Sequence, residues 1–164
     1  MISDEAYVDF REVQQFRQPW LWIVMLSSPV IAIAILWTTM GKNPGEIAAL
    51  HGALLAIVIT DLALAAGFYF IQLITEVRSE GLYIRFVPFV RQLIPYGDIK
   101  TCEARTYSPI GEYGGWGMRW GRSGKAYNIS GNRGVQLEFK DGKRLLIGSQ
   151  RAEELAQAIQ ARMK

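Results

Sequence analysis

Two long apolar runs, separated by a short polar turn, constrain the fold of this chain more than any other feature. The first run covers residues 20–40 and has no charged residue. The second covers residues 47–72, in which His51 and Asp61 are the only basic and acidic residues. Each is about as long as the roughly 20 apolar residues that cross a bilayer core. The intervening turn, 41–46, is too short for anything but a tight connection. The sequence therefore predicts a transmembrane helical hairpin over residues 20–72.

The rest of the chain divides into an N-terminal segment, residues 1–19, and a domain of ordinary soluble composition, residues 73–164. A domain of that length can bury one small core. Its single cysteine, Cys102, excludes an internal disulfide and a cysteine-based metal cage. The sequence shows no paired carboxylates, Ser/His/Asp set or metal-ligand cluster, and its only histidine lies in an apolar run. We therefore expect no enzyme activity, no metal and no cofactor.

The distribution of charge predicts an orientation in the membrane. Of the 18 Lys and Arg residues, 15 lie in residues 73–164 beside nine acids, which gives this segment a net charge of +6. Basic residues that flank a span favour the cytoplasmic side. We expect an integral protein of the bacterial inner (cytoplasmic) membrane, with both termini and the C-terminal domain in the cytoplasm and the turn at Lys42 outside.

A further helix is predicted before the first apolar run. Phe10, Val13, Arg17 and Trp20 follow one another at intervals of three or four residues, which is the spacing of one helix face. A helix of this kind would lie at the membrane surface.

Asp61 is the least expected residue of the hairpin, because an aspartate near the middle of a span costs about 2.5–3.5 kcal/mol on insertion scales. Ser28 on the first run lies at a similar depth. Three roles stay open for Asp61: a polar lock within the hairpin, a contact with a partner span, pigment or lipid group, and a proton or ion relay. Small residues also recur along the second run and predict a helix–helix contact, within the hairpin or with another protein. They include Gly52, Ala56, Thr60 and Gly67.

From Leu73 onward the apolar pattern changes to a period of two, which is typical of strands. The expected strands are 73–78, 82–88, 91–96, 100–107, 125–130, 135–140 and 144–148, and a C-terminal helix follows them. About seven short strands closed by one helix predict a small sandwich or partial barrel. The fold class is therefore an α+β membrane protein.

Several segments resemble a known family. They are Arg91 to Ile99 (RQLIPYGDI), Asp141 to Ser149 (DGKRLLIGS), Tyr113 to Gly117 and Gly131 to Val135. Over residues 20–160 the chain resembles bacterial membrane-anchored pleckstrin-homology-like (PH-like) proteins, in particular their two-span members. The resemblance implies a PH-like β-barrel that binds or scaffolds and carries no catalytic residues. Phosphoinositide-binding relatives have a basic loop between their first two strands, whereas residues 79–81 form a short acidic turn here. This difference argues against inositol-lipid binding by that loop.

A glycine-rich loop is expected over residues 108–124. It does not match a phosphate-binding loop, because Gly124 and Lys125 are followed by Ala126. It does combine aromatic and basic side chains, namely Tyr113, Trp116, Arg119, Trp120, Arg122 and Lys125. Such a set suits contact with anionic lipid headgroups or with a protein partner, and a loop packed on itself is the third alternative. Nucleic acid is not an expected partner of a membrane-tethered domain.

Together these features predict a non-enzymatic, membrane-anchored PH-like module. Its expected role is that of an accessory or scaffolding subunit that binds and stabilises a larger membrane protein complex. The expected partners are membrane lipids and another integral membrane protein. One alternative is a module that binds anionic lipid at the membrane surface, and a weaker one is an enzyme or transporter component that uses Asp61.

Overall fold

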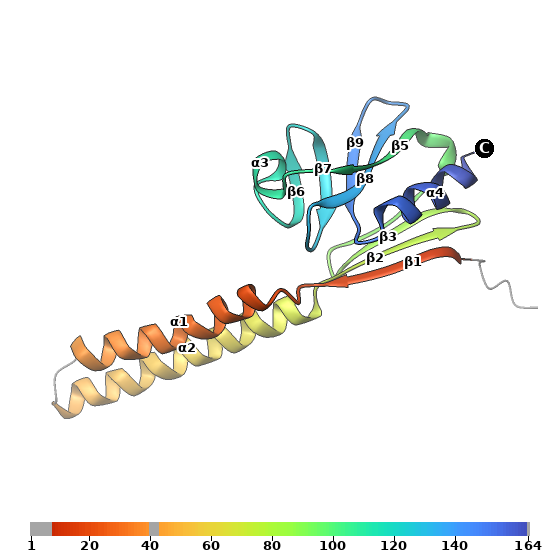
Figure 1. Ribbon diagram of the computed structural model, residues 1–164. Helices are drawn as coiled ribbons and strands as arrows, with labels where there is room; N and C mark the ends of the chain where they lie inside the picture. The colour runs from red at the N-terminus through yellow and green to blue at the C-terminus, as the bar shows by residue number, and fades with distance from the viewer. Residues whose placement is uncertain (1–7, 40–42, 164) are drawn as a thin grey trace, which may run out of the picture. The chain divides into compact units, whose positions relative to one another are not determined.

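The computed structural model describes residues 8–39 and 43–163 and divides the chain into two units (Figure 1). One unit consists of residues 16–70, and the other combines residues 8–15 with residues 71–163. The elements are two long apolar helices, two β-sheets and a C-terminal helix. The predicted α+β class is confirmed at this level.

The helical unit is a hairpin of α1 (Pro19–Thr39) and α2 (Pro44–Phe70). Both helices are long and apolar enough to cross a membrane, so they are candidate spans. The less exposed side chains of α1 recur every three or four residues, as expected for one face packed on a second helix. They include Trp22, Met25, Pro29, Ala32 and Leu36. The predicted pair of long helices is confirmed, whereas the turn at Lys42 lies outside the described residues.

The second unit contains two sheets. Sheet A consists of four antiparallel strands in chain order, β1 (Val8–Gln15), β2 (Gln72–Arg78), β3 (Gly81–Val87) and β4 (Val90–Ile94). Sheet B has the order β5 (Ile99–Thr106), β8 (Arg133–Phe139), β9 (Arg144–Gly148), β7 (Gly124–Asn128) and β6 (Gly117–Gly121). Within sheet B only β7 and β9 run parallel. The remaining elements are η1 (Tyr96–Asp98), α3 (Pro109–Tyr113) and α4 (Ala152–Arg162).

The core of this unit lies between the two sheets. Phe86 of sheet A and Tyr127 of sheet B meet with ring centroids 6.1 Å apart. The fully buried apolar side chains come from both sheets and from α4, and they include Leu73, Leu82, Ile84, Leu137, Leu146, Ile147, Leu155 and Ile159. Helix α4 contacts strands of both sheets (Figure 1). Its apolar side chains recur with the helical period predicted from the sequence, so they lie on one face of the helix. The helix therefore covers the open side of the core.

The interfacial helix predicted near the N-terminus is wrong for residues 8–15, which form strand β1. Phe10 and Gln14 are buried, and Arg11 and Val13 are exposed, which is the alternation of a strand. The helical spacing in the sequence was real, but β2 offers an edge whose backbone groups need partners. Pairing with β2 satisfies them, so residues 8–15 belong to the same compact unit as residues 71–163 rather than to a separate segment.

All seven predicted strands are present, as β2–β5 and β7–β9, and the structure adds β1 and β6. Strand β6 has the sequence GMRWG, whose glycines hide the alternation that identifies a strand. Strand prediction from the period-two pattern therefore worked where both faces carry side chains and missed the glycine-bounded strand.

Two buried tyrosines of the core differ in how their hydroxyl groups are satisfied. Tyr107 Oη accepts a hydrogen bond from Asn128 Nδ2 at 3.1 Å, whereas Tyr127 Oη is buried without a hydrogen-bond partner among the described residues. Tyr127→Phe is therefore expected to raise the free energy of unfolding by about 1 kcal/mol, since an unsatisfied buried hydroxyl is removed. Tyr107→Phe is expected to lower it by about 1–2 kcal/mol. Thermal unfolding of the two variants, followed by circular dichroism, tests whether their stabilities change in opposite directions. Equal shifts of the two unfolding temperatures would contradict the prediction.

Candidate functional site

The glycine-rich segment 108–124 is folded rather than a loop. Its first part is α3, whose N-cap Ser108 accepts a hydrogen bond from the Gly111 N–H at 3.1 Å. Gly114 ends the short helix in the left-handed conformation, with φ of 72°. The second part is β6, which forms a hairpin with β7. The segment therefore presents its side chains from fixed backbone positions.

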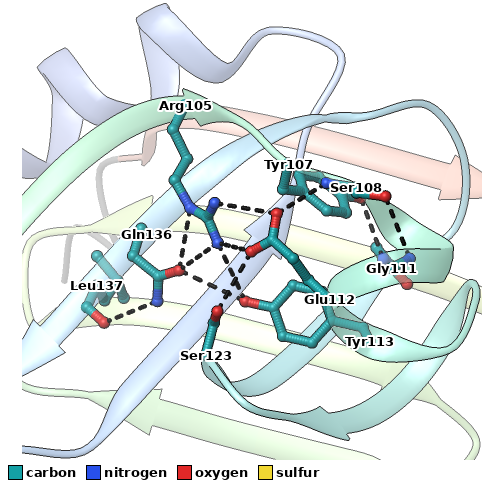
Figure 2. Close-up of polar contacts among 10 residues, drawn as sticks. Arg105, Tyr107, Ser108, Gly111, Glu112, Tyr113, Ser123, Gln136 and Leu137 are labelled. Atoms are coloured by element: carbon teal, nitrogen blue, oxygen red, sulfur yellow. Dashed lines mark hydrogen bonds and ion pairs between the residues drawn. The ribbon is translucent and has the colours of Figure 1, made fainter.

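A network of polar side chains holds this segment against sheet B (Figure 2). Arg105 Nη2 lies 2.7 Å from Glu112 Oε2 and 3.1 Å from Gln136 Oε1. Glu112 also accepts hydrogen bonds from the Ser108 N–H at 2.8 Å and from Ser123 Oγ at 3.3 Å. One carboxylate therefore joins β5, α3 and the β6–β7 turn.

The same network fixes the ionisation of its members. Hydrogen bonds from Arg105 hold the pKa of Glu112 below its ordinary value, and the carboxylate in turn raises the pKa of Arg105. Both carboxylate oxygens of Glu112 are occupied by donors within the unit. A carboxylate held in this way is a poor general base, so the arrangement is structural.

The structure separates the predicted binding residues into two groups. Tyr113 is 4% exposed and packs edge-on against Tyr107, so its assignment to a binding surface is wrong. Trp116 Nε1 donates to the Gly131 carbonyl at 2.9 Å, and Arg119 Nε donates to the Trp116 carbonyl at 2.9 Å. These hydrogen bonds use polar groups of Trp116 and Arg119 to hold the segment itself. The self-packed alternative therefore describes this part of the segment.

Trp120, Arg122 and Lys125 instead line a pocket at the β6–β7 turn. Trp120 is 67% exposed, and Lys125 Nζ lies 5.0 Å from its ring centroid. Among the described residues, neither Arg122 nor Lys125 has a carboxylate within 4.0 Å. The pocket is lined by Trp120, Gly121, Arg122, Ser123, Gly124, Lys125, Gly142, Lys143 and Arg144. We call it the basic pocket, because four of these side chains are cationic and none is acidic.

Lys143 and Arg144 are the members of the basic pocket that sequence reasoning missed. They come from the β8–β9 turn and the start of β9, about 20 residues after the β6–β7 turn. Gly124 permits the approach of the two turns, since a Cβ at this residue would lie 2.4 Å from the Arg144 carbonyl oxygen and its φ is +101°. The parallel pairing of β7 with β9 was the missing information, and no local pattern reveals it.

The helical unit contains a second candidate site, around Asp61. Ser28 Oγ lies 3.2 Å from Asp61 Oδ1 and 3.0 Å from the Met25 carbonyl oxygen. A hydroxyl has one proton, so Ser28 Oγ shares its donation between the Asp61 carboxyl oxygen and the Met25 carbonyl oxygen. The predicted proximity of Ser28 and Asp61 is therefore present. A groove beside this pair, which we call the Asp61 groove, is lined by Ser28, Ala32, Ala56, Ile57, Thr60 and Asp61.

The small residues of α2 divide between the Asp61 groove and the open surface of the helix. Ala56 and Thr60 line the groove. A Cβ added at Gly52 or at Gly67 would meet no atom within 4 Å, so neither glycine is needed for the approach of α1. Of the two contacts predicted for this stripe, the one within the hairpin does not involve these glycines. A contact with another protein stays a prediction.

The described residues offer few groups suited to other chemistry. None of their His, Cys, Asp and Glu side chains form a cluster of three or more that could hold a metal ion. Cys102 is buried, and burial raises the pKa of its thiol to about 12, so its reactive thiolate is scarce at neutral pH. The basic pocket and the Asp61 groove are therefore the two candidate sites, and both are suited to binding.

Comparison with known proteins identifies the family. Residues 1–164 match a family described as a family of unknown function, DUF6141. Neither a curated protein nor a solved structure matches the chain. Because the match covers the whole length, the chain belongs to the DUF6141 family.

Proposed function

We propose that this protein is a non-enzymatic module anchored in the cytoplasmic membrane by the α1–α2 hairpin. Its PH-like unit lies in the cytoplasm, and it acts as an accessory or scaffolding subunit that binds and stabilises a larger membrane protein complex. The two candidate spans support the anchoring. Two facing sheets covered by a C-terminal helix, together with the resemblance described above, support the PH-like assignment.

The pairing of β1 with β2 supports a hairpin that crosses the membrane twice. Gln15 lies opposite Gln72 in the antiparallel register, and the whole helical unit connects these two strands. Adjacent strands of one sheet must lie on the same side of a bilayer, because neither strand can satisfy its backbone groups in lipid. An even number of crossings between them follows, and the two apolar helices supply it.

The Asp61 groove is the observation that carries the subunit proposal. In a bilayer this groove would face lipid, where a carboxyl group with one hydrogen-bond partner in the described structure is costly. Small side chains around it, Ala32 and Ala56, allow a third helix to approach closely. A partner span with a polar side chain would complete the hydrogen bonding of Asp61, which explains why the residue is tolerated there.

Variants of the groove test this proposal. Asp61→Asn is expected to retain the hairpin and a co-purifying partner, because the amide oxygen can still accept a hydrogen bond from Ser28 Oγ. Asp61→Leu and Ala56→Leu are each expected to lose the partner. The first removes a hydrogen bond worth about 0.6–2 kcal/mol, and the second blocks the approach of a third helix sterically. Extraction in mild detergent followed by native mass spectrometry measures the stoichiometry of the complex.

Leu62→Ala is the matched control, since Leu62 is exposed on α2 and does not line the groove. It is expected to leave the complex intact. A monomer in every sample, wild type included, argues against the subunit proposal, as does a complex that survives Asp61→Leu and Ala56→Leu unchanged.

Binding of anionic lipid is a second candidate function, and the basic pocket favours it. Four cations and the exposed Trp120 surround a space that no acidic side chain lines. Each basic group near an anionic membrane surface contributes about 1 kcal/mol, and an indole ring suits the headgroup region. This pocket does not use the acidic turn at residues 79–81, so the mode of binding would differ from that of phosphoinositide-binding relatives.

A further inference from the structure

The β3–β4 turn of sheet A combines an exposed aromatic side chain with two adjacent arginines. Phe89, at the tip of the turn, is 64% exposed. Arg85 on β3 and Arg91 on β4 lie directly opposite each other in the register. Among the described residues, neither arginine has a carboxylate within 4.0 Å. The turn therefore has an apolar tip with two cations behind it.

The facing arginines are unfavourable for the sheet by themselves. Like charges opposite each other on neighbouring strands destabilise the pair. Several other arginines of the unit have acidic partners, such as Arg78 with Glu76 and Arg105 with Glu112. The pair at residues 85 and 91 lacks this compensation within the described structure. An anionic surface outside the protein would supply it.

Strand register places this turn at the end of sheet A from which the helices depart. Gln15, Gln72 and Val87 are successive partners across β1, β2 and β3. Only Ile71 separates the last residue of α2, Phe70, from the first residue of β2. One intervening residue spans about 7 Å at most, and neighbouring strands are about 5 Å apart. The turn therefore lies at the end of sheet A where β2 begins, and β2 follows α2 in the chain after one residue.

We propose that the β3–β4 turn is a membrane-insertion element, in which Phe89 enters the interfacial region of the bilayer while Arg85 and Arg91 contact anionic lipid headgroups. This inference rests on the proposed crossing of the membrane by α1 and α2. Exposed Val13 and partly buried Ile74 continue the same row of the sheet beside Arg85 and add apolar surface to this face. The element would fix the distance and tilt of the folded unit at the membrane.

Site-specific labelling of the full chain tests the insertion. Phe89→Cys is labelled with an environment-sensitive nitrobenzoxadiazole dye, and the protein is reconstituted in vesicles of phosphatidylcholine with phosphatidylglycerol. The unsubstituted chain serves as the background, because Cys102 is buried and its thiol pKa is about 12. Glu80→Cys is the matched control, since residue 80 lies in the turn at the other end of β3, about 20 Å away.

The dye at residue 89 is expected to be quenched by nitroxide-labelled lipid and shielded from aqueous iodide, with the reverse at residue 80. Equal access of iodide to both positions overturns the proposal. Arg85→Gln together with Arg91→Gln is expected to reduce the inserted fraction, by about fivefold in equilibrium constant for each arginine. An inserted fraction that does not change when both arginines are replaced overturns their assigned role.

Carbonate extraction of the same vesicles separates failure of this inference from failure of the proposed function. A chain released by carbonate is not integral, so the proposed anchoring fails and the inference fails with it. A chain that stays in the vesicles with an iodide-accessible dye at residue 89 overturns the insertion element alone.

Discussion

Glu112→Ala is expected to lower the free energy of unfolding of the β-rich unit by about 2–4 kcal/mol. The substitution removes the acceptor for Arg105, for the Ser108 N–H and for Ser123 Oγ together. Hydrogen bonds to a charged group contribute about 1.5–3 kcal/mol each. Their sum is reduced here because Arg105 and Glu112 are both partly exposed to solvent. Arg105 would in addition be left without its counter-charge. Chemical denaturation of the full chain in detergent, followed by circular dichroism, measures the loss.

The pH dependence identifies the carboxylate as the cause. Because its pKa is lowered on folding, the contribution of Glu112 is fully present above the pKa of an unfolded glutamate and is lost as the pH falls through the folded value. The difference in stability between wild type and Glu112→Gln should therefore be constant near neutral pH and shrink below about pH 4.5. Glu103→Ala is the control, since Glu103 is exposed on the same strand as Arg105 and should change stability by less than about 0.5 kcal/mol. A difference that persists unchanged into acid would contradict the assignment.

Arg122→Gln together with Lys125→Gln is expected to weaken binding of anionic lipid by about thirtyfold, at about 1 kcal/mol for each charge removed. These two cations of the basic pocket lack carboxylate partners in the described structure, so their charge is available to a ligand. The measurement titrates short-chain phosphatidylglycerol into the full chain in neutral detergent and follows tryptophan fluorescence, to which the exposed Trp120 contributes.

The matched control for this charge change is Lys100→Gln together with Lys140→Gln. It also removes two positive charges, but neither lysine lines the basic pocket. Its effect should stay within about threefold, the size of a general change in net charge. Equal losses in the two double variants would assign the binding to net charge rather than to the pocket, and insensitivity to added salt would exclude an electrostatic origin.

The sequence was a reliable guide wherever one local pattern decided the structure. The two apolar runs predicted α1 and α2, and the change to a period of two predicted seven strands of the β-rich unit. The N-terminal strand was missed because its partner is 57 residues away from Gln15, at Gln72, and long-range pairing leaves no periodic signal. Residues 10–20 satisfied a helical spacing as well, and only the free edge of β2 decides between the two.

The candidate sites show the same division. The proximity of Ser28 and Asp61 could be predicted by counting residues along two antiparallel helices, because the rise per residue of a helix is constant. The β6–β7 turn was identified by composition, yet its residues have different fates. Tyr113 faces the core and Trp120 faces solvent, which depends on the folding of α3 and on the Arg105–Glu112 pair. Lys143 and Arg144 joined the basic pocket only through the parallel pairing of β7 and β9.

The insertion of the whole helical hairpin between two neighbouring strands has a consequence for biosynthesis. Strand β1 leaves the ribosome first, but β2 emerges only after both helices have been made, so the strand must wait as an unpaired segment. The long intervening segment adds little to the entropic cost of pairing β1 with β2, because each doubling of a closed loop adds only about 0.6 kcal/mol. If α1 and α2 cross the membrane as proposed, completion of sheet A would report that both helices have returned the nascent chain to its starting side, and a chain whose second helix failed to insert could not close that sheet.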